Sequence, residues 1–255
     1  GGVLIALIAQ HLGARAASPS QTYGWARAEI LGALFNGLFL VAMAFYVLWM
    51  GAMRLTHPVQ LATLPMLAAA AGGIVTEVIA LRLLYRRQND DLNMQGAFWH
   101  IAQTFVGSLI IVVSALVVRY TGFLAIDPLL GMAFGLVLFW VSWKILRETL
   151  HILLQGTPRD LDLPAVLSAM STVPGVVDVH HVHAWTLTSG RAMFSAHVRV
   201  ADMARDGDSV LQAMSALLRE RFRVYFSTIQ VETHCTLESE PAAAIDAVRA
   251  APPGR

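Results

Sequence analysis

The sequence predicts an α-helical membrane bundle followed by a small cytosolic α+β domain. The 255 residues are 56% hydrophobic and only 14% charged, a composition more apolar than that of ordinary soluble domains. Four long apolar segments precede residue 150, and each is close to the length that crosses a bilayer as a helix. Beyond residue 156 the pattern changes to short helical and alternating segments, which are typical of a mixed α+β layer.

The membrane domain is expected to cover residues 1–155. It begins within an apolar run, "GGVLIALIAQ", that is only about half of the roughly 20 residues a span requires. We therefore expect this run to be the second half of a helix whose first half precedes Gly1. Complete spans are expected at residues 28–53, 61–84, 97–118 and 128–146, with turn-forming segments between them.

Cationic residues predict the orientation of these spans. Seven lie at the ends that would share one side of the membrane: Arg15, Arg27, Arg82, Arg86, Arg87, Lys144 and Arg147. Two, Arg54 and Arg119, lie at the opposite ends. Because Lys and Arg are enriched in cytoplasmic loops, this distribution predicts a multi-pass membrane protein with its C-terminal domain in the cytoplasm.

The cytosolic domain is expected at residues 156–237. The segments "DLPAVLSAMSTV" and "SVLQAMSALLRERF" carry apolar residues at helical spacing, whereas "VVDVHHVHAWTLTSG", "AMFSAHVRV" and "FSTIQVET" alternate as strands do. The order helix, strand, strand, helix, strand predicts helices packed on one face of a sheet. Residues 238–255 lack a core-forming pattern and are expected to be a mobile tail.

Bulk properties exclude several classes of function. The net charge is +1, so nothing indicates a nucleic-acid partner. Cys235 is the single cysteine of the sequence, which excludes an intrachain disulfide. The chain has no His-Glu-x-x-His motif and no recognisable nucleophile–base set, so we do not expect an enzyme.

Two ionisable residues inside the expected spans, where a charged side chain costs about 2.5–3.5 kcal/mol, are candidates for a function. His100 lies about one turn inside its span and either hydrogen-bonds between helices or binds a metal. Glu77 lies well inside another span and either pairs with Arg82 or serves the same site. Glu29 lies at the cytoplasmic end of the first complete span and is expected to orient that helix end. Asp127 precedes Pro128, where an N-terminal carboxylate interacts favourably with the helix dipole.

Five motifs follow one another along the chain: "QTYGWARAEILGALFNG", "GAFWHIAQTFVGS", "IDPLLGMAFGLVLFWVSWKILRETLHILLQGTP", "PGVVDVHHVHAWTLTSG" and "SAHVRV". In this order and spacing they resemble the cation diffusion facilitator family, particularly its zinc/cobalt/cadmium efflux branch. The resemblance covers the chain from its first residue to about Cys235. It implies a six-helix membrane domain, of which this chain lacks the first helix and most of the second, and a ferredoxin-like cytosolic domain. It also implies a homodimer that exports a divalent metal in exchange for protons.

The resemblance implies a transport site in the membrane. In the family, the fifth helix carries a His-x-x-x-Asp motif, and a second such motif lies on another helix. Residues four apart share one helix face, so the two motifs can present two imidazoles and two carboxylates to a zinc ion. The histidine matches His100, but Thr104 occupies the aspartate position. We hypothesise that Glu77, which stands where the family usually has asparagine, supplies the missing charge; retuned or lost transport are the alternatives.

The resemblance also implies a cytosolic metal site. It aligns His180 and His197 with zinc ligands of the family, and Glu232 with a carboxylate present in some members. Together with His234, these residues are expected to hold a regulatory metal at the dimer interface. A solvated, histidine-rich sheet face is the alternative.

Strand alternation predicts which side chains of the domain share a face. One face is expected to be core: Phe194, Ala196, Val198 and Val200 on one strand, with Ile229 and Val231 on another. The other face is expected to carry His197 and Glu232. The same rule predicts that His181 and His183 point away from His180.

These features predict a secondary transporter that exports Zn²⁺ or a related divalent cation from the cytoplasm in exchange for protons, in a bacterial inner membrane. The ion is then the substrate and a possible regulator, and no prosthetic group is expected. The expected partners are membrane lipid, the metal ion, protons and a second copy of the chain. The alternative, favoured by Thr104, is a degenerate homologue that transports nothing and acts as a metal-sensing partner subunit.

Overall fold

A computed structural model of the chain describes residues 2–57, 62–86 and 92–235, but not the side chains of residues 2–7, 92–97, 99 and 100. The predicted tail at 238–255 lies outside the described residues. By its internal contacts the chain divides into two units, one formed by Gly37–Lys144 and the other by Gly1–Asn36 together with Ile145–Arg255. The domain limits expected at residues 155 and 237 stay predictions.

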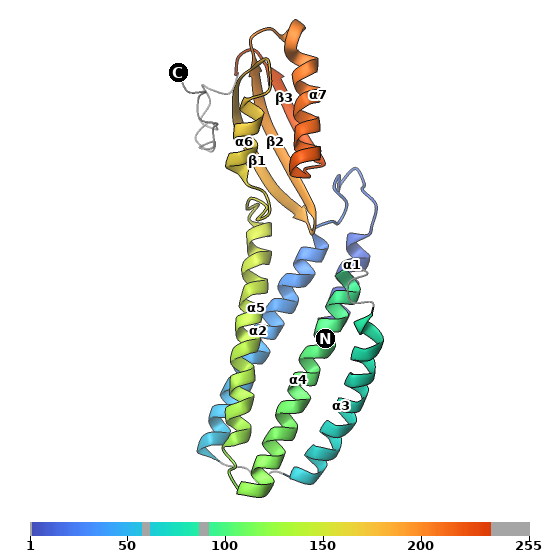
Figure 1. The fold of residues 1–255 in the computed structure, drawn as a ribbon, viewed down its shortest axis with the longest axis vertical. Helices are drawn as coiled ribbons and strands as arrows, with labels where there is room; N and C mark the ends of the chain where they lie inside the picture. Colours follow the sequence, from blue (N-terminus) through green and yellow to red (C-terminus); the bar gives the residue numbers. More distant parts are fainter. Residues whose placement is uncertain (1, 58–61, 87–91, 236–255) are drawn as a thin grey trace. The chain divides into compact units, whose positions relative to one another are not determined.

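Long helices form the first part of the chain (Figure 1): α1 (Gly2–Gly13), α2 (Ala28–Thr56), α3 (Thr63–Tyr85), α4 (Leu92–Thr121) and α5 (Ile126–Leu153). Among the described residues, α2, α3, α4 and α5 are long and apolar enough to cross a membrane. The four predicted spans are thereby confirmed. Some helices extend beyond the predicted spans, because helical hydrogen bonding continues past the apolar segment. The span expected at residues 128–146, for example, lies within α5, which continues to Leu153.

The membrane helices bury few of their own side chains. In the most apolar stretch of each helix, 22% of the residues are buried in α2, 17% in α4 and in α5, and 6% in α3. Large side chains such as Phe35, Trp49 and Trp140 are exposed on these helices. An apolar surface of this extent needs lipid or further protein to cover it.

Two glycines allow α2 and α5 to approach closely within the unit Gly37–Lys144. A Cβ atom added to Gly51 would overlap Cγ of Met132, and one added to Gly135 would lie 3.2 Å from Cγ1 of Val47. Small residues at such crossings let membrane helices pack through close backbone contact. The rings of Phe45 and Phe139 add an edge-to-face contact, with centroids 5.3 Å apart.

Asp127 connects three of these helices. Its Oδ2 lies 3.0 Å from Nη1 of Arg54 in α2, and its Oδ1 accepts a hydrogen bond of 3.0 Å from the buried hydroxyl of Ser114 in α4. It also lies in the first turn of α5, where the sequence predicted a favourable dipole interaction. The carboxylate therefore fixes the mutual position of α2, α4 and α5.

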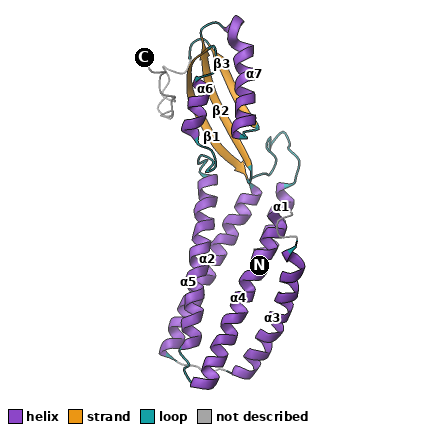
Figure 2. Cartoon of the chain, viewed as in Figure 1, coloured by secondary structure: helices purple, strands orange, loops and turns teal. Residues whose placement is uncertain are grey.

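The C-terminal domain is an α+β layer (Figure 2). Its elements are α6 (Leu163–Ser171), β1 (Val176–Thr188), β2 (Arg191–Val200), α7 (Met203–Phe222) and β3 (Phe226–Glu232), in the predicted order. The strands pair as β1-β2-β3, antiparallel between β1 and β2 and parallel between β2 and β3. The parallel pair requires a crossover, which α7 supplies. This arrangement confirms the predicted fold class.

The core of this domain lies between the sheet and the helices α6 and α7. Phe194, Ala196, Val198 and Val200 of β2 are at most 1% exposed, as alternation predicted. They pack against apolar side chains of both helices, among them Met170 and Met214. Aspartates cap the helix N-termini: Asp162 accepts from the backbone N–H of Ala165, and Asp202 from those of Ala204 and Arg205.

Candidate metal sites

A β-bulge in β1 determines which histidines lie on the open face of the sheet, the face opposite the helices α6 and α7. His180 pairs with His197 and His183 with Ser195, so β1 carries one more residue than β2 between these pairs. His181 accommodates the extra residue with a φ of 48°, in the left-handed region that few non-glycine residues adopt. The predicted orientation of His181 was therefore wrong: its ring centroid lies 5.1 Å from that of His180 and 5.0 Å from that of His197.

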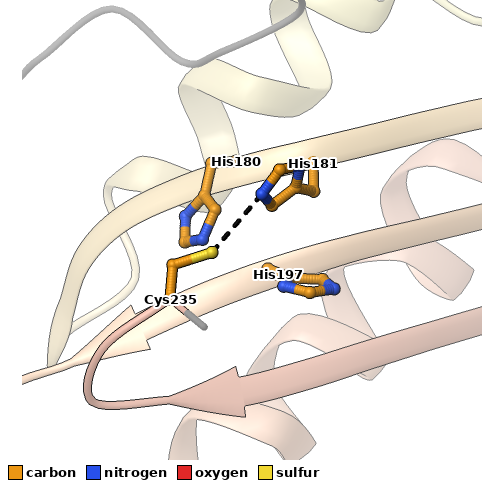
Figure 3. Close-up of side chains that lie close together, drawn as sticks. All are labelled: His180, His181, His197 and Cys235. Carbon is orange, nitrogen blue, oxygen red and sulfur yellow. Dashed lines mark hydrogen bonds between the residues drawn. The ribbon is translucent and has the colours of Figure 1, made fainter. Parts of the chain in front are cut away.

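Four potential metal donors converge beside this bulge (Figure 3). His180 and His181 come from β1, His197 comes from β2, and Cys235 follows the end of β3. One ligand atom from each lies within 4.8 Å of the others. His181 and Cys235 are joined directly, with Nε2 and Sγ 3.4 Å apart. His180 and His181 are buried, and His197 and Cys235 are half-buried.

Carboxylate side chains contact ring nitrogens of His180 and His197. Glu232 Oε1 lies 2.9 Å from Nε2 of His180, and Oε2 accepts a hydrogen bond of 2.8 Å from the side-chain amide of Gln230. Two ring nitrogens, Nδ1 of His180 and Nδ1 of His197, are buried and make no well-aligned hydrogen bond, although each has a carboxylate oxygen 3.2–3.3 Å away. Such nitrogens have a lone pair or proton still to be satisfied.

The electrostatics of the cluster favour neutral imidazole beside an ionised carboxylate. Burial lowers the pKa of the His197 ring; Glu232 raises this pKa, while His181 and His180 lower it further. Burial alone would raise the pKa of the Glu232 carboxyl, but hydrogen bonds from Gln230 and His180 bring that pKa below its ordinary value. Neutral imidazole and ionised carboxylate are the forms that bind metal or orient metal ligands.

The spacing of these donors fits a four-coordinate metal ion. In a tetrahedral zinc site with bonds of about 2.0 Å to nitrogen and 2.3 Å to sulfur, neighbouring donors are about 3.3–3.7 Å apart. The contact between His181 and Cys235, at 3.4 Å, already falls in this range. The remaining separations, up to 4.8 Å, require only small side-chain rotations to close.

The predicted cytosolic ligands are only partly brought together. His180, His197 and Glu232 converge as expected. His234 is exposed, its Nδ1 lies 3.2 Å from the Thr233 hydroxyl oxygen, and it is not part of the donor group formed by the described residues. Sequence reasoning missed His181 and Cys235, because the first depends on the bulge and the second on the turn that follows β3.

The membrane-embedded carboxylate Glu77 lies against α4. Its Oε1 accepts a hydrogen bond of 3.1 Å from Ser108, and its Oε2 is buried with no hydrogen-bond partner among the described residues. No ion pair joins it to Arg82 within the part of the chain that is described. Ser108 lies four residues after Thr104, so both lie on one side of α4.

His100 lies in α4, but its side chain is outside the described residues. Eight residues separate it from Ser108, which corresponds to about 12 Å along the helix axis. Thr104 lies between them and donates a hydrogen bond of 2.9 Å to the carbonyl of Ile101. Glu77 therefore contacts α4 about two turns beyond the position of His100.

Two protein-family models match this chain, one for each of its parts. A model described as the cation efflux transmembrane domain matches residues 1–154. A model described as the cation efflux protein cytoplasmic domain matches residues 158–234. The chain belongs to the cation diffusion facilitator family.

Several curated members of this family are similar over most of their length. The metal cation efflux system protein CzcD of Cupriavidus metallidurans is 34% identical over 229 residues, or 89% of this chain and 72% of that protein. The zinc transporter ZitB of Escherichia coli is 28% identical over 232 residues, or 90% of this chain and 74% of that protein. A cadmium, cobalt and zinc/H(+)-K(+) antiporter of Bacillus subtilis is 26% identical over 235 residues, or 91% and 75%.

A solved structure also matches part of the chain. It is the metal-bound C-terminal domain of the CzcD transporter from Cupriavidus metallidurans, with 33% identity over 28% of this chain and 99% of that one, at a TM-score of 0.27.

As a cation diffusion facilitator, the chain is a multi-pass membrane protein for cation efflux, with a cytoplasmic C-terminal domain, and not an enzyme. The match to the family's dimerisation domain supports a homodimer that takes a metal cation as its substrate.

Proposed function

We propose that this chain exports a divalent transition-metal cation of the Zn²⁺ type from the cytoplasm in exchange for protons, in a bacterial inner membrane. The match to both family domains in their usual order carries the proposal. The names of its relatives, which include zinc, cobalt and cadmium, support this class of ion. Surrounding lipid covers the apolar surfaces of α2–α5.

In this proposal His100 is a ligand of the transport site, and Thr104 stands where the family has an aspartate. Threonine brings no negative charge, so the site holds a dication less tightly than a site with the full set of carboxylates. Glu77 places a carboxylate against α4. Because it lies about two turns from His100, we assign it an electrostatic role along the ion path rather than direct coordination beside His100.

The cytosolic domain is proposed to sense metal. A cluster that includes His180, His197 and Glu232 lies on the open face of its sheet. A metal that binds only one arrangement of the two cytosolic domains shifts the dimer toward that arrangement, in proportion to the difference in affinity. His234 stays a candidate ligand, although in the monomer it is exposed.

Metal uptake by proteoliposomes tests the transport proposal. Purified protein, reconstituted with a pH gradient, is expected to move Zn²⁺ and to move protons in the opposite direction. His100→Ala is expected to reduce uptake at least tenfold, while His57→Ala, outside the proposed ion path, is expected to match the parent. Absence of ion movement in the parent would contradict the proposal.

The alternative is a partner subunit that transports nothing, and the observation that favours it is Thr104. Expression of the chain in a metal-sensitive host, alone and together with an active family member, separates the two functions. Rescue of growth by the chain alone supports transport. Rescue only in the presence of the active member supports the partner role.

A further inference from the structure

We propose that His180, His181, His197 and Cys235 form a closed, four-coordinate site for a thiophilic divalent ion within a single chain, with Glu232 outside the coordination shell. The proposal deepens the metal-sensing role assigned above and rests on it. It replaces the expected ligands Glu232 and His234 with His181 and Cys235.

The first argument is the position of the donors. Three imidazoles and one thiol bring their ligand atoms within 4.8 Å of one another on the open face of the sheet (Figure 3). The contact of 3.4 Å between His181 and Cys235 matches the nitrogen–sulfur separation of a tetrahedral site. His181 reaches this position only because the bulge turns two successive residues of β1 to the same face.

The second argument concerns Glu232. Both of its oxygens are already engaged: Oε1 lies 2.9 Å from Nε2 of His180, and Oε2 accepts from the amide of Gln230 and lies 3.3 Å from Nδ1 of His197. A carboxylate that holds a ring nitrogen of a ligating histidine fixes the orientation of that ring and makes its other nitrogen a better donor. Glu232 is therefore a positioning residue, and the four ring and sulfur donors complete the shell without it.

The third argument is the chemistry of the donor set. Imidazole and thiolate together favour Zn²⁺, Cd²⁺ and Co²⁺ over ions that prefer oxygen, such as Mg²⁺ and Ca²⁺. On binding, the thiol gives its proton to solvent as the metal–sulfur bond forms. The thiolate and the adjacent Glu232 carboxylate together neutralise the dication. Four protein donors leave no open position, which is typical of sites that hold an ion rather than pass it on.

The site would also join all three strands. Its donors lie on β1, on β2 and immediately after β3, so one ion bridges both edges of the sheet and its centre. Ions of this kind stabilise the fold that presents their ligands. Metal in the cytoplasm would thus tighten the domain from within each chain, separately from any contact between two chains.

Cobalt absorption of the full-length protein in detergent tests the proposal. Cys235 is the single cysteine among these 255 residues, and comparison with Cys235→Ser decides whether a near-ultraviolet sulfur-to-cobalt charge-transfer band comes from it. We expect the parent to show this band together with the visible bands of tetrahedral Co²⁺. Cys235→Ser is expected to abolish the charge-transfer band. His181→Ala is expected to weaken Co²⁺ binding about 10–100-fold, whereas the matched control His183→Ala leaves it unchanged.

Cys235→His provides a second variant that keeps a donor in place. It is expected to lose the charge-transfer band while it retains tetrahedral Co²⁺. Co²⁺ bound to the parent with no sulfur band, or binding that depends on His234 and is insensitive to Cys235→Ser, would overturn the proposal. Transport is a separate measurement: a chain that moves no metal but shows the band retains this site and loses the proposed transport.

Discussion

His180 and Glu232, 52 residues apart in the sequence, meet across the open face of the cytosolic sheet, with Nε2 and Oε1 2.9 Å apart. Both side chains are less than a tenth exposed. The pair joins β1 to the end of β3, and His180 is itself one of the four potential metal donors. We expect this pair to raise metal affinity, because a buried carboxylate orients the ring that binds the ion.

Glu232→Gln is expected to weaken Zn²⁺ or Co²⁺ binding to the cytosolic domain about 10–100-fold, because it keeps the shape and removes the charge. Competition against a metal-sensitive dye measures the change. The shape of the visible Co²⁺ spectrum should stay the same, since the coordinating atoms do not change. Glu220→Gln, on the exposed face of α7, is the matched control and should bind as the parent does. An altered spectrum would mean that Glu232 itself coordinates the ion.

Thr104→Asp is expected to strengthen metal binding at the transport site. It places a carboxylate four residues after His100 on the same helix face, where zinc sites use such donors. Uptake by proteoliposomes at low Zn²⁺ should rise about tenfold, equivalent to roughly 1.4 kcal/mol. Thr104→Asn has nearly the same shape without the charge. An equal gain in both variants would show that charge is not the cause.

Glu77→Gln is expected to reduce uptake about tenfold, or roughly 1.4 kcal/mol, because it removes the carboxylate of α3 that contacts Ser108 in α4. Ser108→Ala is the control: it removes the 3.1 Å hydrogen bond but keeps the charge, and should change uptake much less. If Glu77 supplies the charge absent at Thr104, the Thr104→Asp change should partly restore transport to Glu77→Gln. Uptake by Glu77→Gln equal to that of the parent would contradict the electrostatic role.

The metal-free cytosolic domain is expected to lose stability as the pH falls below about 6.5, the ordinary pKa of histidine. Burial lowers the pKa of His197 in the folded chain, so the unfolded chain binds this proton more readily. The stabilisation is complete above pH 6.5 and is lost as the pH falls through the folded pKa. Glu232, whose pKa is also lowered, extends the loss to pH values below its ordinary 4.5.

Hydrogen exchange of β1, β2 and β3, corrected for intrinsic pH effects and measured with a chelator present, follows this stability. His197→Gln should reduce the slope of stability against pH between about pH 6.5 and 5. A slope that is the same in parent and variant would mean that His197 does not titrate between the two states.

The cytosolic fold could be predicted because its patterns are local. The core residues Phe194, Ala196 and Val198 alternate with outward-facing neighbours, and each lies where a regular strand places it. The apolar length of the membrane helices likewise follows directly from the sequence. Such patterns can be recognised within a single helix or strand, without knowledge of its neighbours in the fold.

The donor cluster could not be predicted in full because it depends on irregular and distant features. His181 faces its partners through one extra residue in β1, and an adjacent pair of histidines does not reveal where that bulge falls. Cys235 reaches the cluster through the turn after β3. Asp127 was expected only to favour a helix dipole, yet it also binds Arg54, 73 residues away in the chain.

The bulge at His181 gives this sheet a simple evolutionary route to a different number of metal donors. Removal of that single residue would return β1 to plain alternation, with Val179 and Val182 still inward and His180 still outward. The core and the partner strand would need no compensating change, but the donor group would shrink from four side chains to three. A one-codon insertion or deletion in this strand therefore offers a way to switch between a closed centre and one with room for water or a fourth ligand from a neighbouring chain.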